Sequence, residues 1–172
     1  SGQPATTDEV VFDGTPGGNR NKDCVLDAGK TVASIAFVNY AGTFSFGANG
    51  RNLTLNAGDA DFSGMSRDPV QVGTNLVVFT GTEDQVFTPN AAQAYPGITK
   101  NAASGELRFA GSVRSTGALN LTNGYVNLGA GNAHSFASVA STNGFDGLKF
   151  RSYTLMVSGA ANFRYVPEIG RA

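Results

Sequence analysis

The apolar residues of this chain fall in short bursts in which apolar and polar side chains alternate. Residues 43–46, 53–55, 107–109 and 119–121 are examples. Alternation with a period of two is typical of half-buried β-strands. Turn-forming pairs such as Asn49-Gly50 and Asp146-Gly147 separate the bursts. The Ala-rich stretches 90–94 and 132–140 are the helix candidates, and neither carries a complete apolar stripe. The pattern therefore predicts an all-β protein.

Length and composition favour one domain over residues 1–172. The chain is 41% hydrophobic, which is enough for a core, and only 15% charged, with 23 glycines in place of the missing charge. The net charge is −1 and the basic residues are scattered singly, so we expect no nucleic-acid partner. No apolar run reaches the ~20 residues of a membrane-spanning helix, so we expect no transmembrane segment.

Two patterns point to different all-β architectures. Residues 119–128 place Asn123-Gly124 between two alternating runs, which fits a two-residue hairpin and favours an antiparallel β-sandwich or jelly roll. Three segments, 52–58, 106–112 and 118–124, instead share an apolar-polar-apolar pattern followed by small or turn residues. Such a repeat favours a solenoid, although its copies are irregularly spaced.

A specific resemblance favours the solenoid, with the β-sandwich or jelly roll as the alternative. The rung-like segments are 79–89 (FTGTEDQVFTP), 95–100 (YPGITK), 107–113 (LRFAGSV) and 117–124 (GALNLTNG). Together they resemble the repeats of bacterial secreted and cell-surface proteins that fold as right-handed parallel β-helices, of the adhesin and autotransporter-passenger style. The resemblance implies a parallel β-helix, a secreted or cell-surface location and a structural or adhesive role without enzymatic activity. It carries over no catalytic residue.

A short β-helix exposes strand edges at both ends, and these edges invite pairing with a second copy. We therefore expect self-association into a filament, with strand exchange through the terminal segments 1–12 and 160–172 and cell-envelope glycan as a further candidate partner. The residues expected to carry it are Val10, Val11, Phe12, Phe163, Tyr165 and Val166.

Residues able to support chemistry are few. His134 is the single histidine and Cys24 the single cysteine, so we expect no transition-metal site and no cofactor. We expect His134 to occupy a surface or turn position. Cys24 suits a buried strand position, with an intermolecular disulfide as the alternative. Asp59 and Asp61 are weak candidate calcium ligands, and a solvated turn is the favoured explanation for this pair.

Three alternatives remain open at this stage. A carbohydrate-binding or polysaccharide-cleaving domain would use Tyr40, Tyr95 or Tyr125 as sugar platforms, or Arg108 and Arg114 beside acidic groups. A lysine–asparagine amide crosslink would use Lys30, Lys100 or Lys149. A phage tail-fibre segment would form a trimer.

Overall fold

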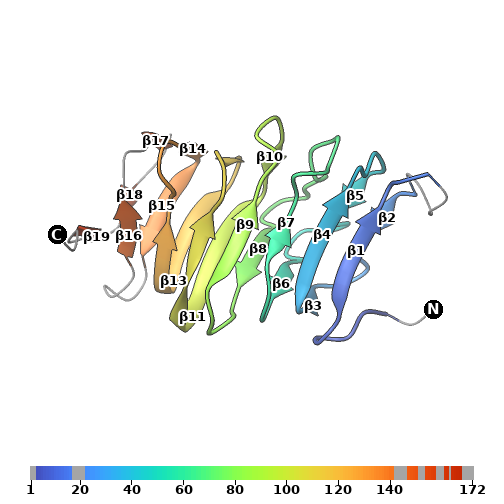
Figure 1. Cartoon of the computed structure of the whole chain (residues 1–172), viewed down its shortest axis with the longest axis horizontal. Coiled ribbons are helices and arrows are strands. Elements are labelled where there is room, and N and C mark those ends of the chain that lie inside the picture. The colour runs from blue at the N-terminus through green and yellow to red at the C-terminus, as the bar shows by residue number, and fades with distance from the viewer. Residues whose placement is uncertain are drawn as a thin grey trace.

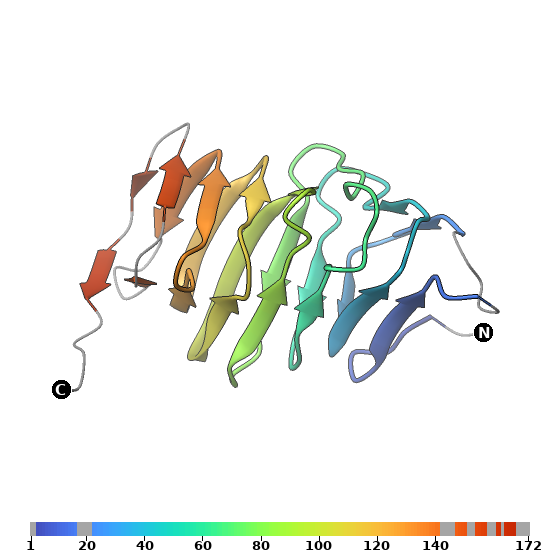
Figure 2. The same ribbon diagram turned by 45° about the horizontal axis from the view of Figure 1, so that its top comes forward.

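The chain winds into a parallel β-solenoid of about six turns, confirming the β-helix prediction (Figures 1 and 2). The computed structural model describes residues 3–16, 22–141, 147–150, 154–157, 161–162 and 164–167, and only the backbone of the last four ranges. No helix occurs in these ranges. All pairings between the described strands are parallel, because each strand lies beside the equivalent strand of the next coil.

Nearly every coil contributes a strand to each of three faces, which we name after their first strand. On the second face, the third coil has only the bridge of Val70 to Ser45. The β1 face comprises β1 (Glu9–Asp13), β4 (Ser34–Val38), β7 (Ala60–Asp61), β9 (Gln85–Thr88), the end of β11 (Gly97–Phe109), the end of β13 (Ala118–Asn127), β16 (Gly147–Phe150) and β19 (Arg164–Pro167). The β2 face comprises β2 (Cys24–Val25), β5 (Phe44–Ser45), β10 (Ala94–Tyr95), β12 (Arg114–Ser115), β14 (Ala133–Phe136) and β17 (Thr154–Val157). The β3 face comprises β3 (Lys30–Val32), β6 (Leu53–Leu55), β8 (Leu76–Phe79), the starts of β11 and β13, β15 (Ser138–Ser141) and β18 (Ala161–Asn162).

The predicted hairpin at 119–128 is wrong. Leu119 and Leu121 pair with Ile98 and Lys100 of β11, while Val126 pairs with Leu107 further along the same strand. Gly124, at a φ of 92°, turns β13 around the corner between two faces. Because Asn-Gly supplies the backbone freedom that either a hairpin or a corner needs, the local sequence does not distinguish them. The neighbouring coils decide, since they supply parallel partners for both halves of β13.

The core is a column of aromatic rings along the inside of the β1 face. Phe12, Phe37, Phe62 and Phe87 follow one another at intervals of 25 residues, and Phe109 continues the column. Successive ring centroids lie 4.8, 4.9, 5.5 and 6.0 Å apart. Such offset and edge-on contacts add to the burial of large apolar surfaces. The column therefore fixes which side chain of each coil points inward.

Side chains at the corners connect successive coils by accepting main-chain N–H groups. The acceptor–donor pairs are Asp23–Thr43, Asn49–Thr74, Asn52–Leu76, Asp59–Val86, Asp68–Ala94 and Asp84–Glu106. These bonds satisfy main-chain N–H groups at positions where strand pairing begins or is interrupted. Buried N–H groups require such partners. The many Asp and Asn residues of the turns thus have a structural purpose.

One corner predicts a measurable stability effect. A Cβ on Gly64 would overlap the main-chain carbonyl of Phe37 in the preceding coil, whereas a Cβ on Gly29 would meet nothing closer than 3.6 Å. We expect Gly64→Ala to lower the free energy of unfolding by roughly 1–3 kcal/mol, because backbone has to move to admit the methyl group. Gly29→Ala is the matched control and should unfold like the wild type in urea titrations. Equal stabilities of the two variants would contradict the close approach of the coils.

Candidate functional site

The most distinctive surface is the N-terminal end of the solenoid. Here β1, β2 and β3 each pair with one described strand, namely β4, β5 and β6. No described strand covers their other edges (Figure 1). Unpaired parallel edges of this kind are templates for adding further strands.

Backbone direction in β1 identifies the exposed hydrogen-bonding groups. The carbonyl of Asp8 accepts from Ala33 at 2.9 Å, and the N–H of Gly14 donates to Val38 at 2.7 Å. Main-chain groups along a strand alternate in direction, so the even-numbered residues of β1 face β4. The odd-numbered residues, including Val11, consequently direct their main-chain groups toward the outer edge.

The interior of the first coil opens into an apolar cavity of about 340 Å³. Val10, Phe12 and Cys24 line it from the first coil, and Phe44 and Leu53 line it from the second. Phe12 and Val10 are only half-buried, whereas Phe37 and Ile35, with which they pair, are buried. We call this cavity the mouth; it is the place where another coil would complete the core.

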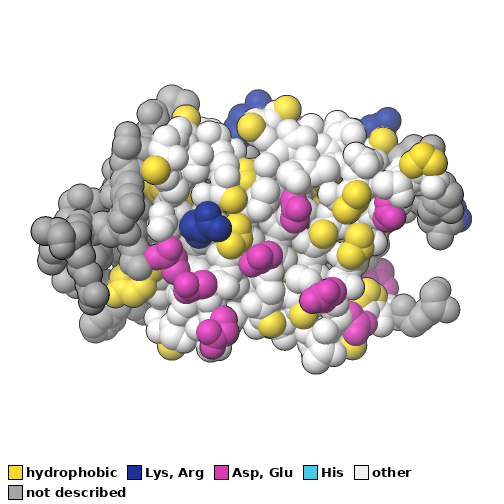
Figure 3. Space-filling view, viewed as in Figure 1, with side chains coloured by type: hydrophobic (Ala, Val, Ile, Leu, Met, Phe, Trp, Pro, Cys, Tyr) yellow, Lys and Arg dark blue, Asp and Glu magenta, His cyan; other side chains and the backbone are white. Residues whose placement is uncertain are grey.

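The two most exposed of the large apolar side chains lie in the first coil. Val11 and Val25 are 59% and 60% exposed, the highest fractions among the large hydrophobic side chains of the described residues. Hydrophobic side chains are visible over β1 and β4 in the space-filling view (Figure 3). They add apolar surface beside the mouth, and Val70, Val72 and Tyr125 of later coils are exposed as well.

The structure places the predicted self-association residues as follows. Val10 and Phe12 point into the mouth, and Val11 lies on the outer surface of β1. Tyr165 and Val166 belong to β19, whose one described partner is β16. Phe163 lies outside the described residues. The strands named from the sequence are therefore the first and last described strands of one face, and association through them stays a prediction.

The candidate calcium ligands Asp59 and Asp61 bind main-chain groups. Asp59 accepts from the N–H of Val86 at 2.8 Å, and Asp61 accepts from the N–H and hydroxyl of Ser63 at 2.9 and 2.6 Å. Among the described residues, no group of three or more His, Cys, Asp or Glu side chains could hold a metal ion. These geometries give the calcium hypothesis no support.

The expectation of a surface position for His134 is wrong. The side chain is 1% exposed and packs against Phe109 and Phe136. Its Nε2 lies 2.7 Å from the carbonyl of Leu128, and its Nδ1 accepts from the N–H of Val113 at 3.2 Å. These partners require a neutral ring with the proton on Nε2, and burial lowers its pKa. His134 thus ties a corner to the core.

Lys100 is the second buried polar group that sequence reasoning did not place. It is 0% exposed and occupies an inward-facing position between Phe79 and Leu121. Its Nζ donates to the carbonyl of Gly81 at 3.0 Å, and burial lowers its pKa. The neighbouring Gln85, also buried, donates to the carbonyls of Leu55 and Gly58. Both side chains satisfy carbonyls of the preceding coil.

These contacts give the crosslink hypothesis no support. Lys100 meets a main-chain carbonyl rather than a side-chain amide, and Lys30 pairs with Asp27 at 2.9 Å. The side chain of Lys149 lies outside the described residues. Cys24 lies in β2 as a half-buried free thiol at the mouth, and burial raises its pKa.

The predicted sugar platforms are largely wrong. Tyr40 and Tyr95 are buried, the first with its hydroxyl on the carbonyl of Lys22 and the second bonded to the main chain of Asn90. Tyr125 is 40% exposed. Arg108 and Arg114 are exposed on different faces. A groove of about 470 Å³ exists elsewhere, lined by polar side chains such as Gln71, Thr74, Thr116 and Asn120 and by apolar ones such as Leu76 and Ala118.

Comparisons with known proteins found no matching family model, no similar curated protein and no similar solved structure. Within the described residues, a search for apolar helices of membrane-spanning length returned none.

The role of His134 gives a pH-dependent prediction. Because its folded-state pKa lies below the unfolded value of 6.5, the unfolded chain binds the proton first on acidification. The stability contributed by the neutral ring is complete above pH 6.5 and is lost as the pH falls below it, by at most about 1.4 kcal/mol per pH unit. His134→Gln keeps a donor and an acceptor but does not titrate.

Urea unfolding at pH 7.5 and pH 5 measures this difference. We expect the wild type to lose more stability than His134→Gln over this interval, while the carboxylates affect both proteins equally. Parallel pH profiles would exclude the buried neutral histidine.

Proposed function

We propose that this protein is a non-enzymatic structural or adhesive component of a bacterial cell surface that assembles end to end by β-strand stacking. The observation that carries the proposal is the set of unpaired strand edges around the apolar mouth. If these edges and apolar side chains packed against the opposite end of a second copy, unpaired backbone groups would be satisfied and apolar surface would be removed from water.

The geometry favours head-to-tail assembly. The last described strands, β19, β17 and β18, belong to the same three faces as β1, β2 and β3, and all run parallel to their neighbours. A second copy displaced along the solenoid axis would therefore extend all three faces. Such a contact joins two different surfaces, so it propagates into a filament unless its rotation closes a ring.

Charge supports the same pairing. On the β1 face, β1 carries Glu9 and Asp13 without a basic residue, and β19 carries Arg164 without an acidic one. Opposite charges at the two ends favour encounter in the head-to-tail orientation and disfavour head-to-head contact.

The groove lined by Gln71, Thr74, Thr116 and Asn120 supports a second candidate, the binding of a neutral glycan. Gln71 bridges to Thr116, 45 residues further on, so a long loop forms one wall over the β3 face. Uncharged amide and hydroxyl groups suit sugar hydroxyls, although no aromatic ring lines the groove. A monodisperse monomer that binds a neutral oligosaccharide, and loses it on Gln71→Ala, would favour this candidate over filament assembly.

Substitution of Val11 tests assembly directly. Val11→Pro removes an N–H that faces the free edge, whereas Val11→Ala keeps the N–H and removes most of the exposed side chain. We expect the wild type to form filaments in negative-stain micrographs and Val11→Pro to weaken association by roughly tenfold through the lost edge contacts. Val11→Ala should assemble better than Val11→Pro.

Sedimentation velocity over a wide concentration range provides the quantitative measurement, and melting temperatures verify that each variant is folded. A wild-type protein that stays monomeric at every concentration would refute the assembly proposal.

A further inference from the structure

Residues 3–8 cross the open end of the first coil before β1 begins. Gln3 and Pro4 line the mouth, so this segment covers part of the surface at which a further coil would stack. A turn follows, in which Asp8 accepts from the N–H of Ala5 at 2.8 Å and donates its own N–H to the Ala5 carbonyl at 3.1 Å. The segment thus holds its own shape independently of the coil beneath it.

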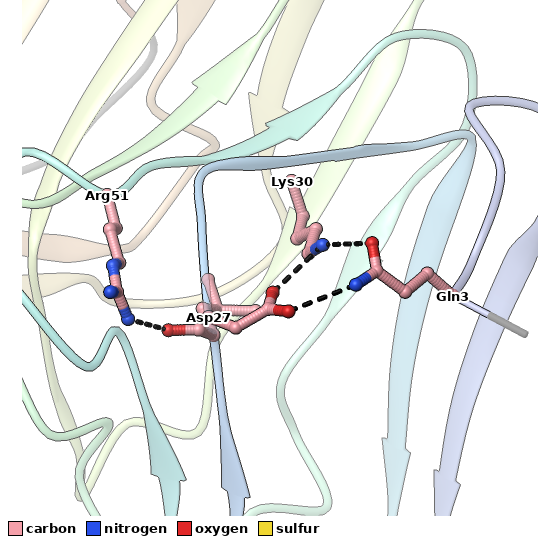
Figure 4. A network of polar contacts seen from close by, with 5 residues as sticks. Gln3, Asp27, Lys30 and Arg51 are labelled. Atoms are coloured by element: carbon pink, nitrogen blue, oxygen red, sulfur yellow. Dashed lines mark hydrogen bonds and ion pairs between the residues drawn. The ribbon is translucent and has the colours of Figure 1, made fainter.

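One side chain attaches the Gln3 end of this segment to the coil, and the Asp8 carbonyl joins the other end to the N–H of Ala33. The amide of Gln3 donates to Asp27 at 3.0 Å and accepts from Lys30 at 2.6 Å (Figure 4). Asp27 and Lys30 form an ion pair at 2.9 Å, so the three side chains are joined in one closed network. Because Lys30 begins β3 and Asp27 stands between β2 and β3, Gln3 is held at the corner between two of the unpaired edges.

The attachment is specific in geometry but weak in energy. Gln3, Pro4 and Asp27 are exposed, and exposed polar contacts of this kind contribute little to stability. Pro4 has no N–H to donate, so the segment is poorly suited to pair as a strand with the β3 edge. The coil below is fixed separately, since Arg51 donates to the carbonyl of Leu26 (Figure 4). The segment can therefore leave without unravelling the coil.

We propose that residues 3–8 form a displaceable cap, latched by Gln3 onto Asp27 and Lys30, which competes with the end of a second copy for the mouth. The inference rests on the proposed end-to-end assembly and adds its regulation. In the closed state the cap hinders stacking, and in the open state β1, β2, β3 and the mouth are all accessible. Association then proceeds at a rate proportional to the open fraction.

The variant Gln3→Ala tests the latch, with Ser104→Ala as the matched control. The exposed side chain of Ser104 also joins two coils, by donating to the carbonyl of Thr82 at 2.8 Å, but Ser104 does not line the mouth. We expect Gln3→Ala to raise the rate at which a small thiol reagent labels Cys24, which lines the mouth, by up to about fivefold, as the loss of about 1 kcal/mol of hydrogen bonding implies. The fluorescence of an apolar dye should rise because the mouth is uncovered, while the melting temperature stays unchanged.

The rate of association, measured by light scattering, should rise by the same factor, because the opening of the cap controls both access to the mouth and association. Cys24 labelling, dye binding and association of Gln3→Ala that all match Ser104→Ala would overturn the inference. Faster labelling of Cys24 with an unchanged association rate would also overturn it, while leaving assembly itself intact. If neither protein associates although labelling of Cys24 accelerates, the proposed function fails and the cap is retained as a local opening.

Discussion

Hydrogen bonding between successive coils is the constraint on which the rest of this structure depends. Strands of two to five residues predominate on its faces, and strands this short are not stable without pairing to neighbouring strands. Parallel stacking supplies those pairs along the whole column, and it also determines that side chains in equivalent positions lie above one another. The aromatic column from Phe12 to Phe109 and the corner carboxylates follow from that alignment.

How much of this fold the sequence reveals depends on which periodicity is sought. The alternation of apolar and polar residues with a period of two predicts the strands, and the small turn residues predict the corners. The interval of 25 residues joining Phe12, Phe37, Phe62 and Phe87 also stands in the sequence, but a search among leucine-centred segments misses it. Coil length then changes: Phe87 pairs with Phe109 at 22 residues and Leu107 with Val126 at 19. Because corners tolerate such length changes, a fixed-period search fails beyond the third coil.

The positions of the buried polar groups were not predictable from local pattern. Lys100 lies where alternation places an inward-facing side chain, yet a lysine in that pattern is ordinarily read as the solvent side. It turns inward because the carbonyl of Gly81, at a corner of the preceding coil, needs a donor. His134 and Gln85 likewise bond main-chain carbonyls at other corners. The carbonyls bound by Lys100 and Gln85 lie in the preceding coil, 19 to 30 residues away in sequence. His134 bonds the carbonyl of Leu128, six residues before it, and the N–H of Val113 in the preceding coil.

The column also explains why its ends, rather than its sides, carry the candidate function. Along the sides, the corner residues that attract attention as chemical groups, such as Asp59 and Asp84, are occupied by main-chain N–H groups of the next coil. At the first coil this relationship is interrupted, because no preceding coil covers Val10, Phe12 and Cys24 within the described residues. The interactions that hold the interior together are therefore available there to an incoming strand. Residues 3–8 cover part of this end, and the side chain of Gln3 holds them there. This weak attachment leaves the end accessible but restrains the unregulated stacking of a second copy.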